Sequence, residues 1–238
     1  MTEQAIQRQG NSVILYDESI VSHMQPGMFS ADYWTDADVV PGYSGGRGAT
    51  LFVCHQGDDW VLKHYHRGGL VGKLFNDGFF YTGFERARSV AEWQILRLAH
   101  EAGLPVPVPV AAHIERRGLV YAADLITRRI PDVMPFSTRL HARPAEPAVW
   151  QAVGECVKRF HDAGFYHADL STHNLQIDSK DRIWLLDWDR GSRMAPGRWQ
   201  GANLERLRRS CRKIHAIDGA HYADDVDWHA LMAGYSGA

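Results

Sequence analysis

The sequence predicts an α+β protein with two lobes: a strand-rich N-terminal lobe over residues 1–126 and a small helical C-terminal lobe over residues 127–238. Short β-prone runs separated by turn residues fill most of the first lobe. Longer segments with helical periodicity fill most of the second, which begins with the proline-spaced linker 131–147. Strands followed by helices, with a linker between them, are typical of α+β proteins.

Composition narrows the class of protein. The 238 residues are 45% hydrophobic and 23% charged, which is ordinary for a soluble globular chain. A formal net charge of -2 lacks the basic excess of a dedicated nucleic-acid binder, so no nucleic-acid partner is expected. No apolar run approaches the ~20 residues that cross a bilayer, and any membrane contact is expected to be peripheral. Three separated cysteines suit a reduced cytosolic compartment and indicate neither a disulfide framework nor structural zinc.

In the first half, two hairpins and one helix are expected. Residues 50–54 and 60–65 are β-prone and flank a turn at 57–59. Residues 85–102 have helical periodicity, which ends at Gly103 with Pro105 beyond it. Residues 108–114 and 119–126 form the second predicted hairpin.

The second half carries the longer helices. Residues 149–163 place apolar side chains on one face, and Gly164 closes the segment. Residues 175–187 read as a short hairpin with a turn at 178–181. A last long helix is expected over about 202–217.

The strongest chemical signal is the segment His167-Ala168-Asp169-Leu170-Ser171-Thr172-His173-Asn174, followed by an apolar strand that ends at Asp187. Asn174 begins one strand of the predicted hairpin and Asp187 ends the other, so antiparallel pairing brings them together. Carboxylate and amide oxygens suit magnesium, which keeps waters and phosphates as its other ligands. The remaining carboxylate, Asp169, can accept a proton from an attacking hydroxyl.

Taken singly, each of these residues is more typical of a turn cap than of a catalytic site. Their combined spacing, H-x-D-x-x-x-x-N with a later Asp, resembles the catalytic loop and metal-binding segment of the protein-kinase-like superfamily. The resemblance implies ATP and Mg²⁺ as cofactors, Asp169 as catalytic base, and Asn174 and Asp187 as metal ligands. The segment Asp187-Trp188-Asp189 departs from the usual D-F-G, so a protein-kinase activation switch is not expected.

Candidates for the nucleotide half of the site lie upstream. A glycine-rich turn over residues 44–49 can bring backbone close to phosphates, although such turns by themselves are usually only turns. Its predicted phosphate-binding residues are Gly45, Gly46, Arg47 and Gly48.

Lys63 lies between apolar neighbours on the next strand and can direct its charge at phosphates. Its partner is expected to be Glu92, which shares a helix face with Ile95, Leu96 and Ala99. Glu85 is the second candidate, but acids are common in a first helical turn. The resemblance also implies that backbone groups near Asp124 and Ile126 contact the adenine.

Only a resemblance to known families indicates which molecule accepts the phosphoryl group. No Ala-Pro-Glu segment follows Asp189, and the chain is too short for a full protein-kinase helical lobe. A protein kinase is therefore not favoured. The segment 167–174, the aromatic insert 68–83 and the compact length resemble the bacterial lipopolysaccharide kinases, and most of all the 3-deoxy-D-manno-octulosonic acid (Kdo) kinase family. That resemblance implies an alcohol-group phosphotransferase of lipopolysaccharide inner-core biosynthesis. It also implies phosphorylation of the 4-hydroxyl of Kdo in Kdo-lipid A, at the cytoplasmic face of the inner membrane.

Two regions suit an anionic glycolipid at a membrane surface. The insert 70–84 combines apolar and aromatic groups with Arg67, Lys73, Arg86 and Arg88. The last predicted helix has the apolar stripe Leu204, Leu207, Cys211 and Ile214. Basic residues that could bind lipid phosphates or the Kdo carboxylate surround it: Arg206, Arg208, Arg209, Arg212 and Lys213. For both regions the favoured interpretation is a structural one, which for this helix is a core-facing stripe with a solvated charged face.

Two other functions fit the same motif. Small-molecule kinases of the aminoglycoside or choline type share H-x-D-x-x-x-x-N but usually have a larger helical lobe. A kinase-like binding protein without activity is the other alternative, although every catalytic position has a plausible occupant. The histidines His161, His167 and His173 match no common zinc spacing, and His167 is expected to hold the catalytic loop by hydrogen bonds. The oligomeric state is not predicted.

Overall fold

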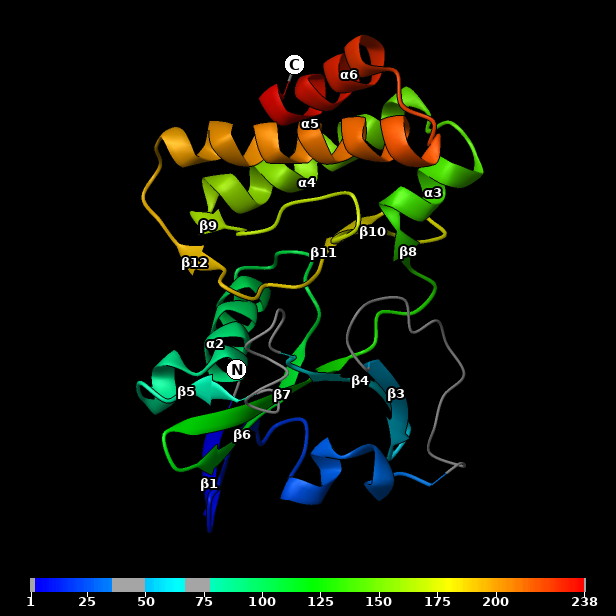
Figure 1. Ribbon diagram of the computed structural model, residues 1–238. Coiled ribbons are helices and arrows are strands. Elements are labelled where there is room, and N and C mark those ends of the chain that lie inside the picture. Colours follow the sequence, from blue (N-terminus) through cyan, green and yellow to red (C-terminus); the bar gives the residue numbers. More distant parts are fainter. Residues whose placement is uncertain (1–2, 36–49, 67–77, 238) are drawn as a thin grey trace. The chain divides into compact units, whose positions relative to one another are not determined.

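The computed structural model describes residues 3–35, 50–66 and 78–237 (Figure 1). The chain divides into two compact units. The first comprises Met1–Arg97 and Val108–Arg129, and the second comprises Leu98–Pro107 and Ile130–Ala238. The mixture of helices and antiparallel sheets confirms the predicted α+β class.

The first unit is built on one antiparallel sheet in the order β1-β2-β6-β7-β4-β3, with β5 added to β7. Its strands are β1 (Gln4–Gln9), β2 (Ser12–Asp17), β3 (Thr50–His55), β4 (Asp58–His64), β5 (Phe79–Phe80), β6 (Pro109–Arg117) and β7 (Val120–Arg128). Both predicted hairpins are present, as β3–β4 and β6–β7. The turn of the first hairpin lies at Gln56 and Gly57, both with positive φ, because Asp58 already belongs to β4.

Both faces of this sheet are covered. The segment with the 3-10 helices η1 (Pro26–Phe29) and η2 (Ala31–Tyr33) shares a core with Trp60, Leu62 and Ile126 of the sheet. Helix α2 (Arg88–Glu101) follows the 3-10 turn η3 (Phe84–Arg86) and is tied to the sheet by polar contacts. The predicted helix 85–102 is therefore shorter at its beginning than its periodicity suggested.

Most of the helices in the described ranges belong to the second unit. They are α3 (Phe136–Ala142), α4 (Pro147–Asp162), α5 (Arg198–Asp218) and α6 (Asp224–Ser236). Its strands are short: β8 (Met134–Pro135), β9 (Phe165–Tyr166), β10 (Leu175–Ile177), β11 (Ile183–Leu185) and β12 (Ser192–Arg193). Strands β10 and β11 form the predicted hairpin, with β8 added beside β10. The predicted linker 131–147 contains β8 and α3, so much of it has regular structure.

Helices α4 and α6 pack with their backbones nearly in contact. A Cβ added to Gly154 of α4 would lie 2.0 Å from the carbonyl oxygen of Leu231, and one added to Gly234 of α6 would lie 2.1 Å from that of Gln151. Glycine is the only residue that allows this approach. In the part of the chain that the structure describes, no helix combines the length and apolar character needed to cross a membrane.

Candidate active site

Strand β4 and helix α2 bring Lys63 and Glu92 together in the first unit. The lysine Nζ donates to both carboxylate oxygens of Glu92, at 3.2 and 3.1 Å, and Tyr65 Oη donates to the same carboxylate. Alternation along β4 explains the arrangement, since Trp60 and Leu62 face the core and Lys63 and Tyr65 point to the other side. Glu92 is 3% exposed, whereas the Lys63 side chain is 30% exposed. The lysine is therefore held by a buried acid, as the sequence predicted.

Glu85, the other candidate partner, lies elsewhere. It belongs to η3, is exposed, and accepts a hydrogen bond from Gln94. The inward helix face, not the first turn, supplies the lysine's partner.

The predicted glycine-rich turn lies outside the described residues. This holds for Gly45, Gly46, Arg47 and Gly48. Arg67 and Lys73 of the aromatic insert are outside them as well. Their assignments remain predictions.

Asp124 and Ile126 lie in the interior of the sheet, because β7 runs on to Arg128. Asp124 is paired with His64 of β4 and His113 of β6, and Ile126 is paired with strands on the same two sides. Backbone groups within a strand that has neighbours on both sides are used by the sheet. The chain leaves the sheet only after Arg128, and the contact of these two residues with the adenine stays a prediction.

The side chain of Asp124 instead joins two histidines. It contacts His64 Nδ1 at 2.6 Å and His113 Nδ1 at 2.9 Å. Burial alone would raise the pKa of Asp124, but the hydrogen bonds from His113 and His64 outweigh it and hold the pKa below its ordinary value. This cluster has no counterpart in the sequence prediction.

In the second unit, the β10–β11 hairpin brings Asn174 and Asp187 to one end, as predicted. Leu175 pairs with Leu185, and the backbone N–H of Leu186 donates to the Asn174 carbonyl at 2.9 Å. The next residue is Asp187. Asn174 Nδ2 donates to the backbone carbonyl of Asp169 at 2.8 Å and lies 3.4 Å from its carboxylate. The three predicted residues are thus gathered by one hairpin and the loop that leads into it.

His167 fixes the shape of that loop. Its Nε2 donates to the Leu186 carbonyl at 2.9 Å, and its Nδ1 accepts from the Asp169 backbone N–H at 3.2 Å. Burial lowers the pKa of His167 below its ordinary value, despite the opposing effect of the Leu186 carbonyl and nearby carboxylates. A neutral imidazole suits this geometry, because one nitrogen must donate and the other accept. The hydrogen-bonding role expected of His167 is confirmed.

The backbone has an uncommon conformation at Asp187, and the residue after it is buried. Asp187 has φ 62°, in the left-handed region that Asp enters more readily than most residues. Trp188 is fully buried beside Phe160 and His167, and its Nε1 donates to the Leu185 carbonyl at 2.9 Å. Trp188, which stands where D-F-G has Phe, is thus part of the core, and the side chain of Asp187 before it is exposed.

Helix α5 supplies a contact that the sequence prediction missed. Arg206 Nη1 donates to Asp169 Oδ1 at 2.6 Å, whereas Arg208 and Arg212 both bind Asp224. The predicted apolar stripe of this helix is buried, which confirms the core interpretation: Leu204, Leu207, Cys211 and Ile214. A run of arginines on a helix is visible in sequence, but their partners are not.

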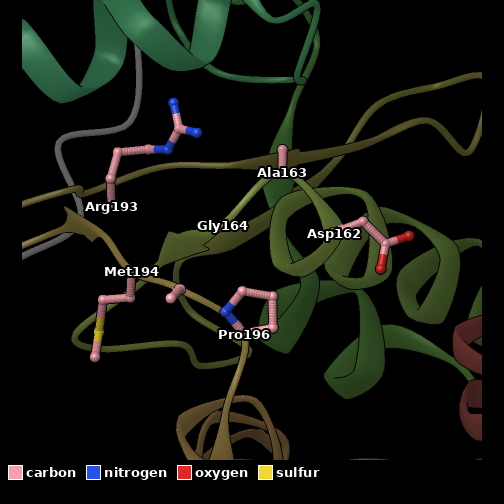
Figure 2. Close-up of a pocket in the computed structure, with 7 residues that line it drawn as sticks. Asp162, Ala163, Gly164, Arg193, Met194 and Pro196 are labelled. Atoms are coloured by element: carbon pink, nitrogen blue, oxygen red, sulfur yellow. The ribbon is translucent and has the colours of Figure 1, made fainter.

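An open hollow of about 540 Å³ lies at the C-terminal end of α4. Its lining includes Gly164, Met194 and Pro196, and Figure 2 shows the side chains of Asp162 and Arg193 pointing away from one another. None of the residues predicted for catalysis lines this hollow. The residues predicted for catalysis therefore lie at the exposed end of the hairpin and not in this hollow.

An antiparallel sheet with an anchored Lys63, followed by a helical unit with an H-x-D-x-x-x-x-N hairpin loop, defines the class of kinase-like folds. The model of the lipopolysaccharide kinase (Kdo/WaaP) family matches residues 31–235, and the chain belongs to this family.

Relatives match nearly end to end. A 3-deoxy-D-manno-octulosonic acid kinase of Vibrio parahaemolyticus is 39% identical over 206 residues, 87% of each chain. The protein of that name from Vibrio vulnificus is 38% identical over 96% of this chain and 97% of its own. One from Actinobacillus succinogenes is 34% identical over 96% and 98%, respectively.

Proposed function

We propose that this chain is an ATP-dependent kinase that phosphorylates the 4-hydroxyl of Kdo in Kdo-lipid A, during assembly of the lipopolysaccharide inner core. The observation that carries the proposal is the near full-length similarity to relatives named 3-deoxy-D-manno-octulosonic acid kinase. The exposed loop with Asp169, Asn174 and Asp187 supplies the groups that such a transfer needs.

Each charged group has a defined task in this mechanism. The carboxylate of Asp169 accepts the proton of the sugar hydroxyl while the hydroxyl oxygen attacks the γ-phosphorus of ATP. The bond between the γ-phosphorus and the β–γ bridging oxygen breaks, and ADP leaves. Lys63, held by Glu92, binds the α- and β-phosphates. Catalysis by this arrangement consists mainly of positioning and charge stabilisation.

Asn174 and Asp187 are the residues that would hold magnesium. Their amide and carboxylate oxygens are hard ligands of the kind that Mg²⁺ prefers, with phosphates and waters as the others. Among the described residues, no group of three or more His, Cys, Asp or Glu side chains gathers as a complete metal site. A magnesium site in which ATP phosphates supply further ligands fits the oxygens of Asn174 and Asp187. Bound magnesium would neutralise charge on the transferred phosphoryl group.

We also propose that the protein binds the cytoplasmic face of the inner membrane peripherally. In the first unit, Phe80 is 60% exposed and Leu119, at the tip of the β6–β7 hairpin, is 83% exposed. Tyr81 N–H donates to the Leu119 carbonyl, and the exposed arginines Arg116 and Arg117 are on β6 beside them. Apolar groups next to arginines suit an anionic lipid surface.

The first experiment is transfer of labelled γ-phosphate from ATP and Mg²⁺ to Kdo-lipid A. Wild type should label this lipid and not lipid A without Kdo, and Asp169→Ala should label neither. Asp225→Ala, which removes an exposed carboxylate from α6, is the matched control and should retain activity. Labelling by Asp169→Ala at the wild-type rate would contradict the assigned base. Absence of labelling by a folded wild type that hydrolyses ATP would contradict the acceptor.

The membrane proposal has a separate test. Co-sedimentation with vesicles of phosphatidylethanolamine and phosphatidylglycerol should fall when Leu119 is changed to Asp. Val226→Asp, at an exposed aliphatic position of α6, should leave binding unchanged. Equal binding by wild type and Leu119→Asp would exclude this hairpin as the contact.

A further inference from the structure

One face of helix α5 runs along the catalytic loop and binds it at three places. Asn203 Nδ2 donates to the His167 carbonyl at 2.8 Å. Arg206 binds the Asp169 carboxylate, and Ser210 Oγ accepts the Thr172 backbone N–H at 3.1 Å. Positions 203, 206 and 210 are three and four residues apart, so they share one helix face.

The helix that supplies these contacts is itself fixed. Its apolar stripe is buried, and Asn203 is 3% exposed. Asn203 Oδ1 accepts from His161 Nε2 of α4 at 3.2 Å, and His161 Nδ1 accepts from Tyr235 Oη of α6 at 2.9 Å. A buried network in which each group has a partner is rigid. Contacts from α5 therefore have defined positions relative to the loop.

Arg206 is the member of this face that contacts the base itself. Residues 169–174, Asp-Leu-Ser-Thr-His-Asn, include no lysine or arginine, so the loop supplies no fixed cation of its own. The distance from Arg206 Nη1 to Asp169 Oδ1 is 2.6 Å, a short, charge-assisted hydrogen bond. The two side chains are 45% and 63% exposed, which leaves the carboxylate within reach of a substrate.

Other arginines of α5 have a different partner. Arg208 and Arg212 bind Asp224, the first residue of α6, and so link two helices. Arg206 links α5 to the loop that carries the base. Arg208 and Arg212 therefore stabilise the packing of two helices, whereas Arg206 contacts the carboxylate proposed as the base.

We propose that Arg206 is a positioning residue for the catalytic base, an inference that rests on the proposed function of Asp169. By binding Oδ1 it fixes the plane of the carboxylate and leaves Oδ2 to accept the proton of the acceptor hydroxyl. Oδ2 lies 3.4 Å from Asn174 Nδ2, on the side of the residue proposed to hold the metal. A base held in one orientation meets the attacking hydroxyl more often in the reactive geometry.

The test compares Arg206→Gln and Arg206→Lys with wild type in the lipid assay. For Arg206→Gln we expect kcat to fall about 10- to 100-fold with both KM values nearly unchanged, since misplacement of a reacting group by ~1 Å costs up to about 10²-fold. Arg206→Lys, which keeps the charge, should recover part of the loss. Arg198→Gln removes an exposed arginine from the first turn of the same helix and should behave as wild type.

A double-mutant cycle decides whether Arg206 acts through Asp169. In an Asp169→Asn background, Arg206→Gln should have no further effect on residual turnover. An equal fall in both backgrounds would overturn the proposal, as would a raised KM for the acceptor with kcat unchanged. The same cycle can be measured on slow ATP hydrolysis, in which water replaces the sugar hydroxyl. A wild type that hydrolyses ATP without labelling the lipid would refute the acceptor and still test Arg206.

Discussion

The acidic side chains proposed for catalysis lie in contrasting environments in the two units. Glu92, in the first unit, is buried and accepts hydrogen bonds from Lys63 and Tyr65. Asp169 and Asp187, in the second unit, are exposed at the end of a hairpin. The first acid is part of the core, and the carboxylates of the other two are at the surface.

Because of this contrast, substitutions at the buried acid and at the exposed acids should affect folding stability differently. Removing one partner of a buried charged pair leaves the other desolvated, which destabilises the fold. Exposed carboxylates keep most of their hydration, and their ion pairs contribute little to folding. We therefore expect changes at Asp169 and Asp187 to affect turnover alone, and changes at Glu92 to affect both turnover and folding.

After the loss of labelling expected for Asp169→Ala, the largest effect on turnover is expected at Asp187. Asp187→Asn should lower kcat by about 10²- to 10³-fold, because it weakens the binding of the magnesium that would stabilise transition-state charge, and loss of one such stabilising group usually costs this much. The melting temperature should change by less than about 2 °C, because the side chain is exposed and Asn tolerates the positive φ. Steady-state kinetics at saturating ATP and thermal unfolding measure the two quantities.

Asp181→Asn is a matched control for this prediction. Asp181 is exposed at the opposite end of the same hairpin and has φ 57°. The control should retain full activity. Equal losses in the two variants would mean that the hairpin, and not a ligand of the nucleotide site, has been disturbed.

A smaller effect, on two properties at once, is expected at Glu92. Glu92→Ala should lower the free energy of unfolding by about 1–3 kcal/mol, because it removes the buried carboxylate to which both Lys63 and Tyr65 donate. The value lies below that of a fully buried pair because Lys63 is partly exposed. Activity should fall as well, since the lysine loses its fixed position. Unfolding in urea measures the change in stability, and steady-state kinetics measures the change in activity.

Glu85→Ala is the control for Glu92. Its side chain is exposed and contacts Gln94, so its replacement should change stability and activity little. If Glu85→Ala lost more activity than Glu92→Ala, the lysine partner would be misassigned.

The smallest effect is a dependence of stability on pH in the second unit. Burial lowers the pKa of both His161 and His167, so below about pH 6.5 the unfolded chain binds more protons than the folded one. Stability is fully present above the unfolded pKa and is lost as pH falls through it toward the folded values. The slope is at most about 1.4 kcal/mol per pH unit for each histidine.

His167→Gln should reduce this slope, because glutamine does not titrate. Its amide can donate to the Leu186 carbonyl and accept from the Asp169 N–H in place of the imidazole. Unfolding measured between pH 5 and 8 gives the comparison. An unchanged slope would show that His167 is equally protonated in both states.

Local pattern was sufficient to predict the hairpins β3–β4, β6–β7 and β10–β11 and to place Asp169, Asn174 and Asp187 near one another. Residues that pair within one hairpin are neighbours in both sequence and space, which is why Asn174 and Asp187 could be placed together. Helix periodicity likewise distinguished Glu92 from Glu85.

Helix α6 was not predicted, because its packing depends on the glycine contact with α4, about 80 residues away in the sequence. The N-terminal β1–β2 hairpin was also missed, since its outer strand is mostly polar.

By itself, the sequence determined the α+β class, the order of the catalytic elements and the chemical type of each group in the loop. Those properties follow from short-range periodicity and from motif spacing. Only the tertiary structure decided that β7 continues through Asp124 and Ile126, and that Arg206 binds Asp169 while Arg208 and Arg212 bind Asp224. Such choices depend on which distant segments the packing brings within hydrogen-bond distance, and a run of arginines in a helix does not contain that information.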